Sequence, residues 1–256
     1  MSDSDIIRLP PGLFISATGT GVGKTFVTRG LASALRRGGR TVAALKPIET
    51  GFPDANPTPE LTDAHQLAAA GQPGTAAPQP GSVLDGSDLE GAFYRAAMPA
   101  APRAVSLATG AGAPDIERLG RAIERAARQV SVVLVEGAGG LLVPLDRERT
   151  IADLAVRLGL PVLLVAPNAL GVLSHALTAC ESAARRELCV AALVLTELTP
   201  PDDDRDPSRP HNAAILRERL ACPVLSFPFC PDATDEALAD AAFSAQLPSL
   251  IPHALS

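Results

Sequence analysis

The sequence predicts an α/β fold in which a doubly wound, mostly parallel sheet carries helices on both faces. Short apolar runs of strand length alternate with amphipathic runs of helix length along almost the whole chain. The run at 132–135 is uniformly apolar, which is typical of a central parallel strand buried on both faces. No fixed-period repeat, heptad pattern or linker interrupts this alternation. We therefore expect a single domain over residues 1–256, with a short leader at 1–11.

The composition narrows the class of protein. Hydrophobic residues make up 46% of the chain and charged residues 20%, as in ordinary globular proteins. A formal net charge of −6 argues against nucleic acid as a partner, because phosphate backbones require clustered cations. We expect neither a membrane span, which needs about 18 apolar residues in a row, nor a signal peptide. The four cysteines show no C-x-x-C pair and no zinc spacing, which favours reduced, mostly buried thiols in a cytoplasmic enzyme.

The chain begins with an expected strand at 12–17, followed by a glycine-rich turn and an amphipathic helix. The helix starts near residue 24, and the pair Gly38-Gly39 after two arginines predicts its end. The pattern then predicts a strand at 41–45, a loop at 48–60, and a helix at 60–70 that is stopped by Gly71. The segment 71–114 is dense in Pro, Gly and Ala and supports no clear assignment.

The second half begins with a clear amphipathic helix at 115–129, for which Asp115 is a candidate N-cap. The buried strand at 132–136 ends in a glutamate followed by glycines. Further helices are expected at 150–158, 171–187, 211–220 and 235–245, and further strands at 161–166, 190–196 and 223–227.

The turn after the first strand carries the sequence A-T-G-T-G-V-G-K-T at 17–25. Its glycines allow backbone N–H groups to curl around an anion, and the following helix presents its positive end to the same cavity. Lys24 supplies a cation for the β- and γ-phosphates, and the Thr25 hydroxyl can ligate Mg²⁺. The strict phosphate-loop spacing requires glycine where Thr18 stands, so this is a longer variant. The pattern favours a nucleoside-triphosphate site of the P-loop NTPase type over a chance glycine-rich turn.

Three charged residues are candidates for the ligand-binding site. Lys46 directly follows an expected strand and Glu136 ends another, so both lie at the carboxyl edge of the sheet. Lys46 is either a ligand-binding cation or a solvated strand-end lysine, whereas Glu136 is best interpreted as a carboxylate for Mg²⁺. Asp63 lies in the first turn of a helix, where the residues alone favour a simple interaction with the helix dipole.

Two other polar features receive structural interpretations. His175 at a helix start is more readily explained as a polar packing residue than as a catalytic one. The three aspartates at 202–204 have no spaced metal-ligand pattern, and they favour a solvated turn.

Together with the loop at 17–25, K-P-I-E-T-G at 46–51 and V-E-G-A-G-G at 135–140 make the chain resemble the dethiobiotin synthetase family. The resemblance covers nearly the whole chain, and only 71–114 matches loosely. It implies an ATP-dependent cyclo-ligase of biotin biosynthesis that converts 7,8-diaminopelargonic acid (7,8-diaminononanoate) and CO₂ to dethiobiotin. The route passes through a carbamate and a carbamic-phosphoric anhydride, and ADP and phosphate are released. Mg²⁺ as cofactor and a homodimer with substrate at the subunit interface are implied as well.

The resemblance assigns a role to each matching position and replaces the dipole interpretation of Asp63. Catalytic roles fall to Lys46 and Lys24. The implied substrate contacts are Thr20, Lys46 and Thr50, and the implied metal ligands are Thr25, Asp63 and Glu136. The implied nucleotide contacts are Gly21, Val22, Gly23, Lys24, Thr25, Phe26, Asp63, Glu136, Gly137, Ala138, Gly139, Thr196, Glu197, Pro228, Phe229, Cys230 and Asp235.

Three positions depart from the family pattern. Thr196 stands where well-known members have an asparagine that reads adenine. A hydroxyl offers one donor instead of the paired donor and acceptor of the amide, so a triphosphate other than ATP, such as CTP, could serve. Gly21 replaces an acid that some members carry beside the phosphates. Ser174 replaces an asparagine in the helix whose N-terminus, near Gly171, would point at the substrate carboxylate in the partner subunit.

Two rival functions remain for a chain with this loop. One is a P-loop amidoligase of the cobyrinic acid diamide synthase type, which usually carries a glutaminase domain; we expect no room for that domain in these 256 residues, unless it is a separate subunit. The other is a partitioning-type ATPase switch, which normally has a further lysine near the start of the loop and a basic DNA-binding surface. Here Ala17-Thr18-Gly19 stands at the start of the loop, and the net charge of −6 does not favour a basic surface, so the synthetase is the preferred interpretation.

Overall fold

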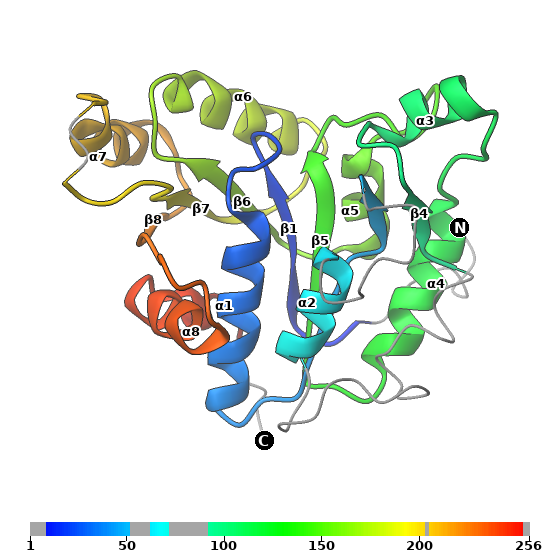
Figure 1. Cartoon of the computed structure of the whole chain (residues 1–256), viewed down its shortest axis with the longest axis horizontal. Coiled ribbons are helices and arrows are strands. Elements are labelled where there is room, and N and C mark those ends of the chain that lie inside the picture. The colour runs from blue at the N-terminus through cyan, green and yellow to red at the C-terminus, as the bar shows by residue number, and fades with distance from the viewer. Residues whose placement is uncertain (1–8, 52–61, 72–91, 203–204, 253–256) are drawn as a thin grey trace.

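A computed structural model describes residues 9–51, 62–71, 92–202 and 205–252 (Figure 1). Its central sheet has the strand order β2-β5-β1-β6-β7-β8, and every neighbouring pair is parallel. The predicted parallel, doubly wound sheet is therefore confirmed. The bounds of these strands are Gly12–Ala17 (β1), Val42–Leu45 (β2), Val132–Gly140 (β5), Val162–Pro167 (β6), Val190–Thr196 (β7) and Val224–Phe227 (β8).

Helices cover both faces of this sheet, and each face has its own apolar core. Side chains alternate along β1, so that Leu13 and Ile15 pack on one side and Phe14 on the other. The first side is covered by α1 (Lys24–Arg37), α2 (Asp63–Gly71) and α8 (Asp235–Ser244), which lie in front of the sheet in Figure 1. The second is covered by α4 (Ile116–Ala127), α5 (Ile151–Leu158), α6 (Val172–Ala184) and α7 (Arg209–Arg219).

Several helix ends have the caps that the sequence indicates. The Asp115 carboxylate accepts the backbone N–H groups of Glu117 and Arg118 at 3.0 and 3.1 Å. Gly38 caps the C-terminus of α1, where its N–H donates to the carbonyl of Ala34. The helix expected at 171–187 ends earlier, at Ala184, because the chain turns at Glu187, whose φ is +56°.

For several short elements, the sequence predicted the wrong structure or predicted none. Residues 48–50, expected to be loop, form strand β3 (Ile48–Thr50), which pairs in parallel with β4 (Tyr94–Ala96) in a separate two-stranded sheet. Three residues are too few to display an alternating pattern. Helix α3 (Pro102–Thr109) begins with proline in its first turn and ends at Gly110, whose φ is +74°. A final 3₁₀ turn, η3, spans Leu247–Leu250. The expectations for 52–61 and 72–91 lie outside the described residues.

Within the described part of the chain, no helix combines the length and the apolar character required to cross a membrane. The cysteines are free thiols, as expected, but they are less buried than predicted. Cys180, Cys222 and Cys230 are half-buried, and Cys189 is exposed.

Candidate functional site

The glycine-rich loop forms a turn between the end of β1 and the start of α1. Gly21 and Gly23 have φ values of +71° and +90°, a left-handed conformation that favours glycine. Gly23 is the N-cap of α1 and supplies no side chain to the helix end, so the first N–H groups of α1 lack a side-chain cap. The backbone N–H of Thr18 donates to the carbonyl of Val165 at 3.0 Å, which joins the loop to β6.

Thr196 lies beneath this loop at the end of β7 and is 3% exposed. Its hydroxyl has the carbonyl oxygens of Val22 and Ala166 as acceptors, at 2.8 and 3.2 Å. Its methyl group lies 3.2 Å from the place that a Cβ on Gly23 would occupy. The side chain of Thr196 therefore contacts the underside of the phosphate loop.

Lys24 is buried at the first position of α1. Its Nζ donates to the carbonyl of Gly19 at 3.1 Å, within the loop itself. Burial lowers the pKa of Lys24 to about 8, against the opposing influence of the Glu136 carboxylate, while the nearby Lys46 ammonium lowers it further. A phosphate in the loop would supply the negative charge that this ammonium lacks.

Glu136 is the centre of the site and is fully buried. Its Oε1 accepts from Lys46 Nζ at 2.5 Å and from the Thr25 hydroxyl at 3.0 Å. Its Oε2 accepts from the Thr28 hydroxyl at 2.6 Å. Both carboxylate oxygens thus have partners inside the protein, which is what a buried charge requires.

Lys46 joins this glutamate to a second carboxylate. Its Nζ lies 2.9 Å from Asp63 Oδ2, at the first residue of α2. Burial alone would lower the pKa of Lys46, but the attraction of Glu136 and Asp63 outweighs it, and the pKa is raised. Lys46 is therefore a permanent cation at neutral pH.

The parallel sheet brings these groups together. Leu45 in β2 pairs with Val135 in β5, so the next residues along the two strands, Lys46 and Glu136, emerge side by side. Ile15 of β1 pairs with Glu136 itself, which places the phosphate loop beside them. The site therefore lies at the carboxyl edge of the sheet, where ligands bind in folds of this kind.

A pocket of about 680 Å³ opens over this cluster. The implied site residues that line it are Thr20, Gly21, Gly23, Lys24, Thr25, Phe26, Lys46, Thr50, Asp63, Ala138 and Gly139. Four further implied site residues are buried beneath the pocket: Val22, Glu136, Gly137 and Thr196. Three of them, Val22, Glu136 and Thr196, form hydrogen bonds within the site. The remaining implied nucleotide contacts, Glu197, Pro228, Phe229, Cys230 and Asp235, lie outside its lining.

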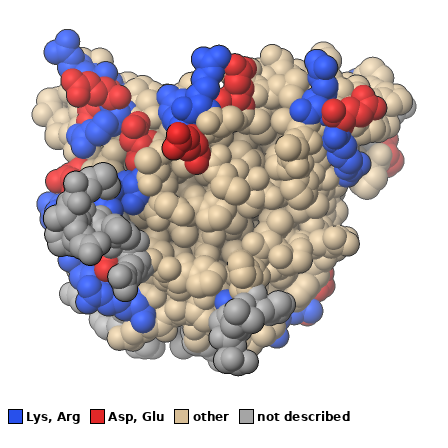
Figure 2. Space-filling model, turned by 180° about the vertical axis from the view of Figure 1, so that it is seen from behind, with Lys and Arg blue, Asp and Glu red and all other residues tan. Residues whose placement is uncertain are grey.

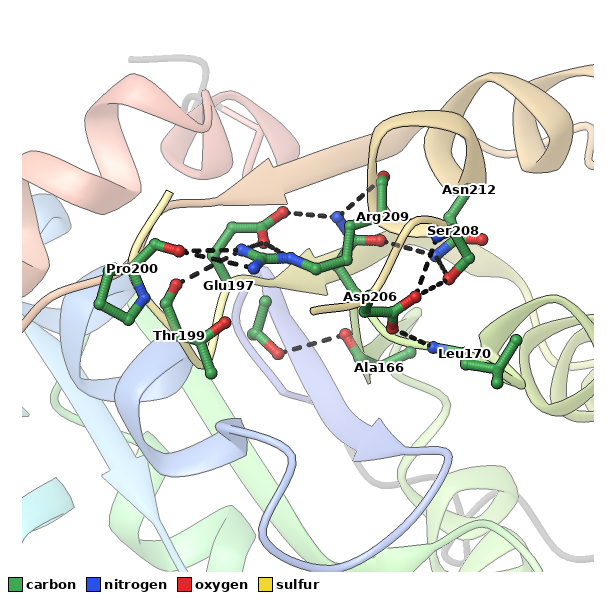
Figure 3. A network of polar contacts seen from close by, with 11 residues as sticks. Ala166, Leu170, Glu197, Thr199, Pro200, Asp206, Ser208, Arg209 and Asn212 are labelled. Carbon is green, nitrogen blue, oxygen red and sulfur yellow. Dashed lines mark hydrogen bonds and ion pairs between the residues drawn. The ribbon is translucent and has the colours of Figure 1, made fainter. Parts of the chain in front are cut away.

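Glu197 belongs to a polar network at the ends of β7 and α7 (Figure 3). Its Oε1 accepts from the Asn168 amide at 2.6 Å, and its Oε2 lies 2.7 Å from Arg209 Nη2. The Asn212 amide donates to Asn168 Oδ1 at 3.0 Å, which extends the network into α7. These contacts fix the chain that leaves β7.

Asp235 is engaged in a similar way at the start of α8. Its Oδ1 accepts from Nη2 and Nε of Arg29, at 2.7 and 3.0 Å. Arg29 also donates to Gln66 in α2, at 3.0 Å, and to the carbonyl of Ala233, at 3.1 Å. One arginine of α1 therefore ties α2 and α8 to the helix that follows the phosphate loop.

Sequence reasoning missed several residues of the site. Thr28 follows Thr25 by three positions and so lies on the same helix face, a spacing that could have identified it. Glu49 lies inside the K-P-I-E-T-G motif, but only the structure shows that it contacts α2. Leu198 lines the pocket and has no recognisable signal.

The donor set fits a hard divalent cation such as Mg²⁺. Thr25, Asp63 and Glu136 offer hydroxyl and carboxylate oxygens, the ligands that Mg²⁺ prefers. Among the residues that the structure describes, no three His, Cys, Asp or Glu side chains form a ready-made metal cluster. Such a cation would therefore need oxygens from phosphate or water in addition, as is usual for Mg²⁺ with nucleotides.

Comparison with known proteins adds relatives of substantial similarity. A family model described as "AAA domain" matches residues 11–237. A protein named ATP-dependent dethiobiotin synthetase BioD from Anaeromyxobacter dehalogenans (strain 2CP-C) is 40% identical over 223 residues, covering 86% of this chain and 91% of the relative. A protein of the same name from Caulobacter vibrioides (strain NA1000 / CB15N) is 41% identical over 201 residues, covering 75% and 83%.

Solved structures resemble the fold at lower identity. The MinC:MinD cell division protein complex from Aquifex aeolicus matches with a TM-score of 0.55 at 13% identity, covering 96% of this chain and 98% of that one. Cobyrinic acid a,c-diamide synthase from Mycobacterium smegmatis, with bound ADP and magnesium, matches with a TM-score of 0.51 at 17% identity, covering 93% and 94%. At these identities the likeness shows the shared α/β fold alone.

Proposed function

Since the chain belongs to the ATP-dependent dethiobiotin synthetase family, we infer that it closes the ureido ring of dethiobiotin in biotin biosynthesis. The enzyme is an ATP-dependent carbon–nitrogen cyclo-ligase. It converts 7,8-diaminopelargonic acid and CO₂ to dethiobiotin, and ATP to ADP and phosphate. The observation that carries this assignment to the site is the cluster of Lys46, Asp63 and Glu136 beside the phosphate loop, with contacts of 2.9 and 2.5 Å.

The reaction needs no protein nucleophile, so the residues act by positioning and electrostatics. One amine of the substrate adds to CO₂, loses a proton and becomes a carbamate. A carbamate oxygen attacks the γ-phosphorus of ATP, and the bond to ADP breaks. The second amine then attacks the carbonyl of the mixed anhydride, loses its proton, and phosphate leaves as the ring closes.

Each step places negative charge near a lysine. We assign Lys24 and the loop N–H groups to the β- and γ-phosphates. The negative phosphates would favour the charged form of Lys24, which burial disfavours in the free protein. We assign Lys46 to the meeting point of carbamate and γ-phosphate, because its raised pKa keeps it cationic throughout. Thr20 and Thr50 line the same pocket and supply hydroxyl contacts to the substrate.

Mg²⁺ would be held by Thr25, Asp63 and Glu136, and it would neutralise charge on the nucleotide phosphates. Lys46 now occupies the space between the two carboxylates, at 2.9 Å from Asp63 and 2.5 Å from Glu136. This ammonium keeps the two acids together and prevents their mutual repulsion.

We place the nucleotide base near the ends of β7 and β8, with Thr196, Glu197, Pro228, Phe229, Cys230 and Asp235 around it. In support, the N–H of Glu197 donates to the carbonyl of Phe227 at 2.9 Å, so the two strand ends adjoin. The hydroxyl of Thr196 already faces two backbone carbonyls, at 2.8 and 3.2 Å. The hydroxyl hydrogen of Thr196 is thus directed at the backbone, and Thr196 does not offer the base the paired donor and acceptor of an asparagine amide. This is consistent with use of CTP or another triphosphate as well as ATP.

We also propose a homodimer with the substrate at the subunit interface. Figure 2 supports it, because the centre of the face turned away from α1, α2 and α8 carries few charged side chains. Leu170, next to the start of α6, is 84% exposed and is therefore available for an apolar contact with a partner subunit. The N-terminus of α6 would then approach the carboxylate of the substrate bound in the partner.

The family relationship decides against the rival functions. A relative at 40% identity covered over 91% of its length outweighs a fold likeness to a diamide synthase at 17% identity. No residue contact in the described structure favours the diamide synthase or the partitioning switch over the ligase.

Product analysis by mass spectrometry tests the function directly. Purified protein, Mg²⁺ and bicarbonate are mixed with ATP or CTP, with and without 7,8-diaminopelargonic acid. We expect dethiobiotin only with the diamine, and the two nucleotide arms rank the triphosphates. Triphosphate hydrolysis that is unaffected by the diamine and yields no dethiobiotin would contradict the assignment.

A further inference from the structure

A carboxylate outside the proposed reaction machinery caps the helix that carries Asp63. Glu49, in β3, is 7% exposed. Its Oε1 accepts the backbone N–H of Asp63 at 2.7 Å, and its Oε2 accepts that of Ala64 at 3.4 Å. These are the first two N–H groups of α2, which have no partner within the helix.

The helix does not need Glu49 in order to begin. The Thr62 hydroxyl accepts the N–H of His65 at 3.1 Å, and the N–H of Gln66 donates to the carbonyl of Thr62 at 3.1 Å. A local cap therefore already closes the first turn. What Glu49 adds is a fixed distance between β3 and the backbone of Asp63.

This attachment leads directly to the reacting centre. Asp63 Oδ2 lies 2.9 Å from Lys46 Nζ, which lies 2.5 Å from Glu136 Oε1. Lys46 directly follows β2, and Glu49 lies three residues later in β3, so the contacts from Glu49 through α2 to Lys46 close a ring within this short segment. Arg95, the partner of Glu49 in β4, lies 3.8 Å from its Oε2 and balances part of its charge.

We propose that Glu49 is a positioning residue, which sets the Asp63 carboxylate at the distance from Lys46 and Glu136 that binding of Mg²⁺-nucleotide requires. The proposal rests on the metal role given to Asp63 above. Residues that orient a metal ligand typically change metal affinity or activity by about 10- to 100-fold when removed. The effect should therefore appear in Mg²⁺-dependent binding rather than in stability alone.

The test compares ADP binding by titration calorimetry with and without Mg²⁺, in wild type, Glu49→Ala and Glu49→Gln. Asp115→Ala is the matched control, because Asp115 also caps a helix with two N–H contacts, but in α4. We expect Glu49→Ala to reduce the gain in ADP affinity from Mg²⁺ by about 10-fold or more, with Mg²⁺-free affinity unchanged. Glu49→Gln keeps one acceptor oxygen and should fall in between, whereas Asp115→Ala should keep the full gain.

Asp63→Asn separates this inference from the proposed function. If Glu49 acts through Asp63, Glu49→Ala should have no further effect on the Mg²⁺ gain in the Asp63→Asn background. An equal loss in both backgrounds, or a Mg²⁺ gain that neither Glu49 variant changes, would overturn the proposal. Dethiobiotin formation by the wild type reports on the function independently of either result.

Discussion

Binding of nucleotide near pH 8 should be accompanied by uptake of a proton by Lys24. In the free protein, burial lowers the pKa of this lysine to about 8, so about half of the molecules carry a neutral amine at pH 8. Phosphate oxygens in the loop favour the ammonium and raise its pKa. The expected uptake is therefore about 0.1 proton at pH 7, about 0.5 at pH 8 and about 0.9 at pH 9.

Titration calorimetry with Mg-ADP in buffers of different ionisation enthalpy measures this uptake as the slope of heat against buffer enthalpy. Lys24→Arg is the control, because a guanidinium stays charged over the whole range and should give no rise from pH 7 to 9. Equal slopes for wild type and Lys24→Arg at pH 8.5 would refute the reasoning.

The same pKa gives the sign of a stability change. The folded pKa of Lys24 lies below the ordinary value of 10.5, so below pH 8 the charged lysine costs folding free energy. That cost should be relieved as pH rises from about 8 to about 10.5, since the unfolded chain then binds the extra proton. A Lys24→Met variant should lack this rise in urea denaturation.

Three substitutions test other parts of the site. Lys46→Ala should abolish dethiobiotin formation while leaving much of the ADP affinity, and near-normal turnover would show that its catalytic role is wrong. Thr196→Asn should sharpen the preference for ATP over CTP in initial rates, and unchanged ratios would mean that this position does not read the base. Thr28→Val should lower the free energy of unfolding in urea by about 2 kcal/mol, because it removes a 2.6 Å hydrogen bond to the buried charge of Glu136. The control is Ser33→Ala in the same helix, where the buried hydroxyl has no partner among the described residues, and little change is expected; equal losses would contradict the Thr28 argument.

Long, strongly patterned elements were predictable because their periodicity follows from burial. The uniformly apolar run at 132–135 became the strand between β2 and β1, and the apolar stripe of 115–129 became α4. The short strand β3 was not predictable, since its three residues are held by pairing with β4, more than 40 positions later in sequence. Such pairing depends on tertiary contacts that local pattern does not contain.

The residues of the candidate site were likewise predictable only in part. The positions of Lys46 and Glu136 were predictable, because each comes directly after a run of apolar strand residues and parallel strands end at one edge. The local pattern did not distinguish Asp63 from an ordinary first-turn acid; only the family resemblance implied a metal role for it, and the structure places its carboxylate 2.9 Å from Lys46 Nζ. Glu49 was likewise hidden, because its partners are backbone N–H groups that carry no side-chain signature.

The anchoring of the phosphate loop from below has a consequence for the kinetics of binding. Thr196 holds the carbonyl of Val22 at 2.8 Å, the N–H of Thr18 is bound to β6 at 3.0 Å, and Lys24 closes the loop on Gly19 at 3.1 Å. The chain has thus lost its conformational freedom during folding, before any nucleotide arrives. Nucleotide then meets a preorganised receptor, so association should proceed in a single fast phase without a slow rearrangement of the loop.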